Sequence, residues 1–224
     1  DTYYVQNFAR AKAAGLLVGP YHYAIWSRTP QVEAEYFLTY AAPYITPGHL
    51  PPMLDLELGD NPGAPVGATS VCDWAQQWID IVKAQTGVEA GVYLSASRTN
   101  TFGGCFSPLP LLWVADWCGD NICTACGDIT DPSTQPEYSY NLPPWGHNNW
   151  TFWQCCSTGS VPGISGRCDL DVFNGTYTEL LECLIGTPNE IVRSPSSLTP
   201  TAVAGLDPPA QTFTVANGIE GTMP

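Results

Sequence analysis

Two hydrophobic periods alternate along the chain. Apolar residues three or four positions apart predict helices with one buried face. These helical segments are residues 2–14, 30–45, 70–86 and 177–184. Short apolar runs closed by Gly, Pro, Asp or Asn predict buried strands. These strand segments are residues 16–23, 51–57, 91–95, 111–117, 150–154 and 169–175. The repeated alternation predicts an α/β fold with a parallel sheet, closed at this length into an irregular TIM-like (β/α) barrel.

Residues at the helix ends and along the helix faces sharpen this prediction. Gly15 and Gly87 follow the first and third helices as C-terminal stops, and Ser70 is the expected N-cap of the third. The apolar positions at helical spacing are Val32, Tyr36, Phe37 and Tyr40 in the second helix and Trp74, Trp78, Ile81 and Val82 in the third. The residues of the third helix share one face.

Composition divides the chain into three parts. Residues 1–186 hold all the alternating elements and form the predicted barrel domain. Residues 187–201 are rich in Ser, Thr and Pro, which is typical of an extended linker. Residues 202–224 contain strand-like runs and form a predicted strand-forming tail.

The charge balance narrows the range of partners. Only 7 Lys and Arg stand against 21 Asp and Glu, which gives a net charge of −14. Nucleic-acid binding requires a basic face, and seven scattered cations do not build one. No apolar run reaches the length that spans a membrane. We therefore expect neither a nucleic-acid nor a membrane partner.

The nine cysteines favour an oxidising compartment and disulfide bonds. Cys123 and Cys126, with Cys118 upstream, would also suit a zinc knuckle, but disulfides explain so many cysteines better, and we expect no metal. The odd count leaves one thiol free or bonded between chains. A chain that begins at Asp1 without Met has the form of a mature, processed polypeptide, so we expect a secreted, extracellular protein.

Asp55 and Glu57 carry the most informative chemistry. Side chains alternate along a strand, so the two carboxyls face one side and Leu54 and Leu56 the other. At about 3.3 Å per residue their α-carbons stand roughly 6.6 Å apart, which leaves room for one substrate oxygen. Carboxyls this close beside an apolar strand repel each other and lose solvation, so one should keep its proton to a higher pH. Glycosidases use such a pair; a solvated strand end is the alternative explanation.

Other candidate residues have two interpretations each. Trp26, Trp113, Trp117 and Trp153 lie at or near strand ends, where sugar stacking and plain packing fit equally well. His22 lies inside an apolar strand and is expected to be a hydrogen-bonded core residue rather than a catalyst.

Several motifs occur in an order that resembles glycoside hydrolase family 25, the lysozymes (N,O-diacetylmuramidases) with an irregular α/β barrel. The motifs are Tyr21-His22-Tyr23, Met53-Leu54-Asp55-Leu56-Glu57, Val92-Tyr93-Leu94-Ser95, Leu112-Trp113-Val114-Ala115-Asp116-Trp117, Trp153-Gln154 and Asp169-Leu170-Asp171-Val172-Phe173-Asn174-Gly175. They are specific as a set rather than singly. The resemblance covers roughly residues 1–186.

The resemblance implies cleavage of the β-1,4 bond between N-acetylmuramic acid and N-acetylglucosamine in peptidoglycan, without a cofactor. By the same resemblance, Glu57 is the acid that protonates the glycosidic oxygen, and Asp55 is its charged neighbour. Asp169 is a third catalytic carboxylate. The substrate-binding residues so implied are Tyr21, Tyr93, Trp117 and Gln154.

The chain also departs from the family, whose members begin with two strands that are absent from the start of this sequence. The tail around Gly205-Leu206-Asp207 and Thr212–Thr222 echoes those strands, with Asp207 in the place of a first-strand aspartate. We therefore hypothesise that the tail completes the barrel in its own subunit or in the next one. Strand donation between subunits would build a filament, which leaves a structural protein of an extracellular polymer as the alternative to a peptidoglycan hydrolase.

Overall fold

The computed structural model describes residues 3–57, 68–96, 111–117, 150–186, 191–194 and 214–217. The chain divides into two compact units, residues 1–185 and 186–224. The residues Cys118, Cys123, Cys126 and Asp207, together with most of the tail, lie outside the described residues.

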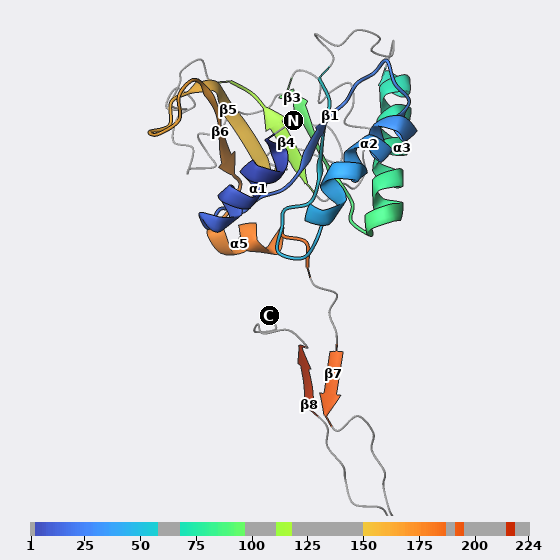
Figure 1. The fold of residues 1–224 in the computed structure, drawn as a ribbon, viewed down its shortest axis with the longest axis vertical. Helices are drawn as coiled ribbons and strands as arrows, with labels where there is room; N and C mark the ends of the chain where they lie inside the picture. Colours follow the sequence, from blue (N-terminus) through green and yellow to red (C-terminus); the bar gives the residue numbers. More distant parts are fainter. Residues whose placement is uncertain are drawn as a thin grey trace, which may run out of the picture. The chain divides into compact units, whose positions relative to one another are not determined.

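The first unit alternates helices and strands in the predicted order (Figure 1). Its helices are α1 (Tyr4–Ala13), α2 (Pro30–Ala41), the 3-10 turn η1 (Ala42–Tyr44), α3 (Ala68–Thr86) and α5 (Tyr177–Glu182). Its strands are β1 (Tyr21–Tyr23), β2 (Met53–Asp55), β3 (Gly91–Ser95), β4 (Leu112–Ala115), β5 (Phe152–Gly159) and β6 (Cys168–Phe173). Each lies within or overlaps its predicted segment. Gly15 and Gly87 have φ of 80° and 74°, the left-handed conformation expected just past a helix C-terminus.

The six strands form one curled sheet in the order β1-β2-β3-β4-β5-β6. Strands β1 to β5 are parallel neighbours, as predicted, but β6 runs antiparallel to β5. The prediction of a wholly parallel sheet is wrong at this strand, because the short connection after Gly159 leaves no room for a crossover helix. Among the described residues the sheet is a half-barrel, so its completion by the tail stays a prediction.

One face of the sheet packs on the helices and holds the core. The core contributions of the strands include Leu54, Val92, Leu94, Leu112, Val114 and Trp153, and those of the helices Phe37, Leu38, Trp74, Trp78, Ile79 and Val82. Helices α2 and α3 lie side by side (Figure 1), with the rings of Phe37 and Trp78 centred 5.1 Å apart. Alternation along each strand leaves the opposite face to polar and aromatic side chains.

Helix α2 buries a different face from the one that its apolar spacing marks. Val32, Tyr36 and Tyr40 are 49%, 51% and 54% exposed, whereas Glu33 is completely buried beside Phe37. The apolar spacing was therefore misleading for three of the four positions. Tertiary pairing explains this orientation, since it brings Glu33 within reach of one buried and one exposed partner.

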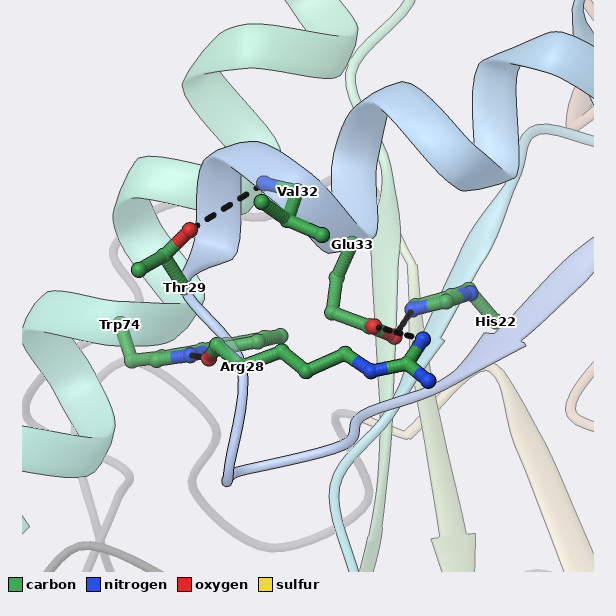
Figure 2. Close-up of polar contacts among 6 residues, drawn as sticks. All are labelled: His22, Arg28, Thr29, Val32, Glu33 and Trp74. Carbon is green, nitrogen blue, oxygen red and sulfur yellow. Dashed lines mark hydrogen bonds and ion pairs between the residues drawn. The ribbon is translucent and has the colours of Figure 1, made fainter.

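Those partners are His22 and Arg28 (Figure 2). The Glu33 carboxylate lies 2.8 Å from His22 Nε2 and 3.1 Å from Arg28 Nη1. The His22 ring stacks on Trp78 at 5.4 Å and 11°, which agrees with the expected core role of this histidine. Burial lowers the pKa of His22, while the charge and hydrogen bond of Glu33 oppose the shift.

The helix N-termini give one confirmation and one correction. Thr29 caps α2 by accepting a hydrogen bond from the Val32 amide, as Figure 2 shows. Helix α3 begins at Ala68, two residues before the predicted N-cap Ser70, so that cap assignment is wrong.

The cysteines in the described part of the first unit are in two states. Cys72 and Cys155 are disulfide-bonded. Cys156, Cys168 and Cys183 are free thiols. Cys156 is buried in the core and behaves there as a small apolar residue.

The second unit contains a two-stranded antiparallel sheet of β7 (Ile191–Ser194) and β8 (Thr214–Asn217). Strand β7 lies in the segment expected to be a linker, and β8 lies in the expected tail. Within the described ranges, no helix of the chain is long and apolar enough to cross a membrane.

Candidate active site

A cavity of about 360 Å³ lies on the sheet face that does not carry the core. It is lined by Tyr21, Tyr23, Asp55, Glu57, Tyr93, Trp113, Gln154 and Asp169. These residues come from all six strands or the positions directly after them, and the strand register sets Tyr23 beside Asp55 and Asp55 beside Tyr93. The lining combines three carboxyls with four aromatic rings, a composition suited to binding and cutting a sugar chain.

Asp55 and Glu57 face this cavity from one side of the chain, as alternation predicts, while Leu54 and Leu56 are buried in the core. Asp55 is the last residue of β2 and is 9% exposed. Glu57 lies two residues past it, at the exposed rim, where its backbone carbonyl accepts a hydrogen bond from Trp26 Nε1 at 2.9 Å. The pair therefore has one buried and one open member.

The buried member, Asp55, keeps its proton to an unusually high pH. Burial, followed by the charges of Glu57 and Asp169, raises the pKa of Asp55 to about 7. The sequence predicts a raised pKa for one of the two carboxyls without identifying which. The structure assigns it to Asp55, whereas the family resemblance takes Asp55 as the charged neighbour of a protonated Glu57.

A small polar network surrounds Gln154, which is 4% exposed. Its Oε1 accepts hydrogen bonds from Tyr93 Oη at 3.0 Å and from Trp117 Nε1 at 2.9 Å. Burial and the neighbouring carboxylates raise the pKa of Tyr93 above its ordinary value, so its hydroxyl keeps its proton and donates. Trp117 does not line the cavity itself and is 60% exposed.

Trp113 forms part of the aromatic wall. Its ring meets Tyr93 edge to face at 5.0 Å, and its Nε1 donates to Asp171 Oδ1 at 2.7 Å. The pKa of Asp171 is raised to about 6, mainly because the carboxyl is partly buried. The hydrogen bond from Trp113 opposes this rise, and the charge of Asp169 adds to it. The hydrogen bond fixes the tilt of the Trp113 ring toward the cavity.

Six of the predicted site residues meet in this cavity: Tyr21, Asp55, Glu57, Tyr93, Gln154 and Asp169. Trp117 reaches it only through Gln154, and Asp207 lies outside the described residues. Of the strand-end tryptophans, Trp113 lines the cavity, whereas Trp26 and Trp153 are buried.

Sequence reasoning missed Tyr23 and Asp171. Each lies two positions from a residue that was predicted, Tyr21 and Asp169, and strand alternation places such pairs on one face. Applying alternation to every strand rather than to β2 alone would have found both. Within the described ranges, no group of three or more His, Cys, Asp or Glu residues is placed to hold a metal ion.

Comparison with known proteins gives a consistent result. The pattern of the family described as glycosyl hydrolases family 25 matches residues 1–164. Lysozyme M1 of Streptomyces globisporus is 28% identical over 190 residues, which cover 81% of this chain and 58% of that protein. The uncharacterised protein YegX of Escherichia coli K12 is 30% identical over 181 residues, covering 80% and 56%. The chain thus spans little more than half the length of these relatives.

Solved structures extend the likeness to the fold. The bacterial lysozyme of Streptomyces coelicolor is similar with a TM-score of 0.62 and 29% identity, over 82% of this chain and 79% of that one. A family 25 lysozyme from Aspergillus fumigatus is similar in fold, with a TM-score of 0.59 and 23% identity over 83% and 81%.

Proposed function

This chain belongs to family 25 of the glycosyl hydrolases, and from that membership we propose that it hydrolyses peptidoglycan at the β-1,4 bond between N-acetylmuramic acid and N-acetylglucosamine. The observation that carries the proposal is the carboxyl pair Asp55 and Glu57, which opens with Asp169 into one cavity walled by aromatic rings. This arrangement supplies the acid and the negative charge that glycoside hydrolysis requires.

Each carboxyl has a role that follows from its position. Glu57 lies at the exposed rim, where it can reach the glycosidic oxygen and give it a proton as the bond breaks. Asp169 shares the cavity and supports the positive charge that develops on the sugar ring. Asp55 is neutral below about pH 7 and donates a hydrogen bond; above that pH it adds a second stabilising charge.

The remaining cavity residues position the sugar. Tyr21, Tyr23 and Trp113 present ring faces and edges to the sugar, and sugar C–H groups pack well on such rings. Peptidoglycan lies outside the cytoplasmic membrane, so the proposal includes action outside the cell. Nothing in the described part of the chain favours the filament alternative, and it is not proposed as a function.

The direct test is the loss of hydrolysis in Glu57→Gln. We expect release of reducing sugar from purified peptidoglycan to fall at least about 100-fold, because an amide cannot deliver the proton. The exposed Glu35→Gln on α2 is the matched control and should retain full activity. Circular dichroism should show that both variants are folded.

Mass spectrometry of the wild-type products then identifies the bond. Fragments ending in reducing N-acetylmuramic acid support the proposal, and fragments ending in reducing N-acetylglucosamine would reassign the bond. Absence of any reducing sugar from pH 4 to pH 8 with the wild-type protein would exclude the hydrolase function.

A further inference from the structure

The orientation of the Gln154 amide can be derived from its two partners. An indole Nε1 only donates hydrogen bonds, so the Gln154 atom that lies 2.9 Å from Trp117 Nε1 must be the carbonyl oxygen. The Tyr93 hydroxyl contacts the same oxygen at 3.0 Å and must therefore donate as well. Side-chain amides are ambiguous when their partners can both donate and accept, and the indole removes that ambiguity here.

The two donors use both lone pairs of Gln154 Oε1. The backbone is held as well, because Gln154 lies on β5 between two neighbouring strands and its carbonyl accepts from the Asp116 amide at 3.1 Å. The described hydrogen bonds of this side chain all fall on Oε1. Its Nε2 is therefore left to donate to a ligand in the cavity that Gln154 lines.

Of the other polar groups around the cavity, the carboxylates and Tyr93 accept hydrogen bonds, whereas the hydroxyls of the exposed Tyr21 and Tyr23 can also donate. Asp169 and Glu57 accept through their carboxylate oxygens when ionised. Tyr93 has turned its proton toward Gln154 and offers only lone pairs to the cavity. A sugar hydroxyl can satisfy such a surface by donating. A carbonyl oxygen cannot donate, and carboxylates repel it, so it needs an N–H or O–H group.

We propose that Gln154 is the specificity-determining residue of this cleft and donates through Nε2 to the carbonyl oxygen of a sugar acetamido group. Trp117 and Tyr93 are positioning residues that keep the amide in this orientation. The inference rests on the proposed function for its substrate class, and it adds the group on the sugar that is recognised and the residue that recognises it.

Two neutral tetrasaccharides test the proposal. Chitotetraose carries an acetamido group at C2 of each ring, and cellotetraose carries a hydroxyl there. Calorimetric titration in a Glu57→Gln background prevents hydrolysis. Measurements at pH 8 keep Asp55 ionised. The amide introduced by Glu57→Gln and the Tyr21 and Tyr23 hydroxyls are the same in every protein compared, so a change in selectivity reports on Gln154. We expect the parent protein to bind chitotetraose more tightly than cellotetraose.

Gln154→Glu is the decisive variant, because its carboxylate still accepts from Trp117 and Tyr93 but has no N–H to donate. It should weaken chitotetraose binding about tenfold and change cellotetraose binding much less. Trp117→Phe removes one donor to Gln154 Oε1 and so lets the Gln154 amide turn over. It should lower the preference for chitotetraose over cellotetraose by a smaller factor than Gln154→Glu does. Trp117 is exposed, so this variant keeps the test usable if Gln154→Glu does not fold.

If Gln154→Glu weakens the binding of both sugars equally, Gln154 has a packing role only and the proposal is overturned. An unchanged preference for chitotetraose in both variants would also overturn it. The outcome is separable from that of the proposed function. Acetamido-selective binding by a wild-type protein that releases no reducing sugar would sustain this inference and exclude hydrolysis. Hydrolysis of peptidoglycan by a protein without acetamido selectivity would support the proposed function and overturn this inference.

Discussion

Asp55 shows how a single residue acquires its chemistry from its surroundings. It ends strand β2 beside the buried strand β3, so its carboxyl loses water while Glu57 and Asp169 add negative charge nearby. Both effects favour the neutral form, and together they raise the pKa to about 7. The same environment that prepares this group for chemistry should reduce the stability of the fold at neutral pH.

Asp55→Asn should therefore stabilise the protein above pH 7. The folded state holds the Asp55 proton when the unfolded chain, with a pKa near 3.8, has lost it. The free energy of unfolding of the wild type thus falls as pH rises from about 4 to about 7. The free energy of unfolding gained by Asp55→Asn should be absent at pH 3.5 and should grow between about pH 4 and pH 7. It should level off above pH 7 at no more than about 4 kcal/mol.

Guanidinium denaturation at pH 3.5, 5.5 and 8 measures this difference. The exposed Asp73→Asn on α3 serves as the control and should shift stability by less than about 0.5 kcal/mol at any of these pH values. A gain that does not depend on pH would contradict the raised pKa of Asp55.

At the scale of elements, β1 and α2 depend on each other. Strand β1 has three residues; Tyr21 and Tyr23 line the cavity, and His22 between them points to the helices. His22 meets Glu33 of α2 there, in a site closed by Phe37 and Trp78. A buried contact between His22 and Glu33 thus joins the back of the cleft to the helical layer.

Glu33→Gln should remove the charge of this pair while retaining its volume. We expect a loss of about 2 kcal/mol in the free energy of unfolding, since His22 and Arg28 lose a charged acceptor. We also expect the pKa of His22 to fall further, because Glu33 is the group that opposes the effect of burial. Nuclear magnetic resonance titration of the His22 ring and chemical denaturation measure the two effects, and Glu35→Gln is the control. An upward shift of the His22 pKa would contradict the pairing.

At the scale of the whole molecule, the net charge of −14 opposes the proposed substrate. Cell walls rich in carboxylates and phosphates should repel the protein at neutral pH and low salt. Salt screens this repulsion, with a Debye length of about 30 Å at 0.01 M and about 8 Å at 0.15 M.

Lysis of whole anionic walls at pH 7 should therefore rise several-fold between 0.01 M and 0.15 M sodium chloride. Hydrolysis of a neutral chito-oligosaccharide is the internal control and should change little over the same range. Turbidity of wall suspensions and release of reducing sugar give the two rates. Equal salt dependence for both substrates would show that long-range charge does not limit access to the wall.

Local pattern determined much of this protein. The hydrophobic periods of 2.0 and 3.6 residues, together with the turn residues, predict the six strands of the sheet and four helices. They also predict that Asp55 and Glu57 face the same side. Such patterns can be read from the sequence because they depend only on neighbours within a few positions. Gly15 and Gly87 end helices for the same local reason. The division into a barrel domain (residues 1–186), a linker and a tail remains a prediction from the sequence.

Only the tertiary structure decided the direction of β6, the buried face of α2, the carboxyl that keeps its proton and the orientation of the Gln154 amide. Each depends on groups far away in the chain, such as His22 for Glu33 and Trp117 for Gln154. Charge and hydrogen-bond energies act over distances in space, and a linear pattern holds no record of which distant residues the fold brings within 3 Å.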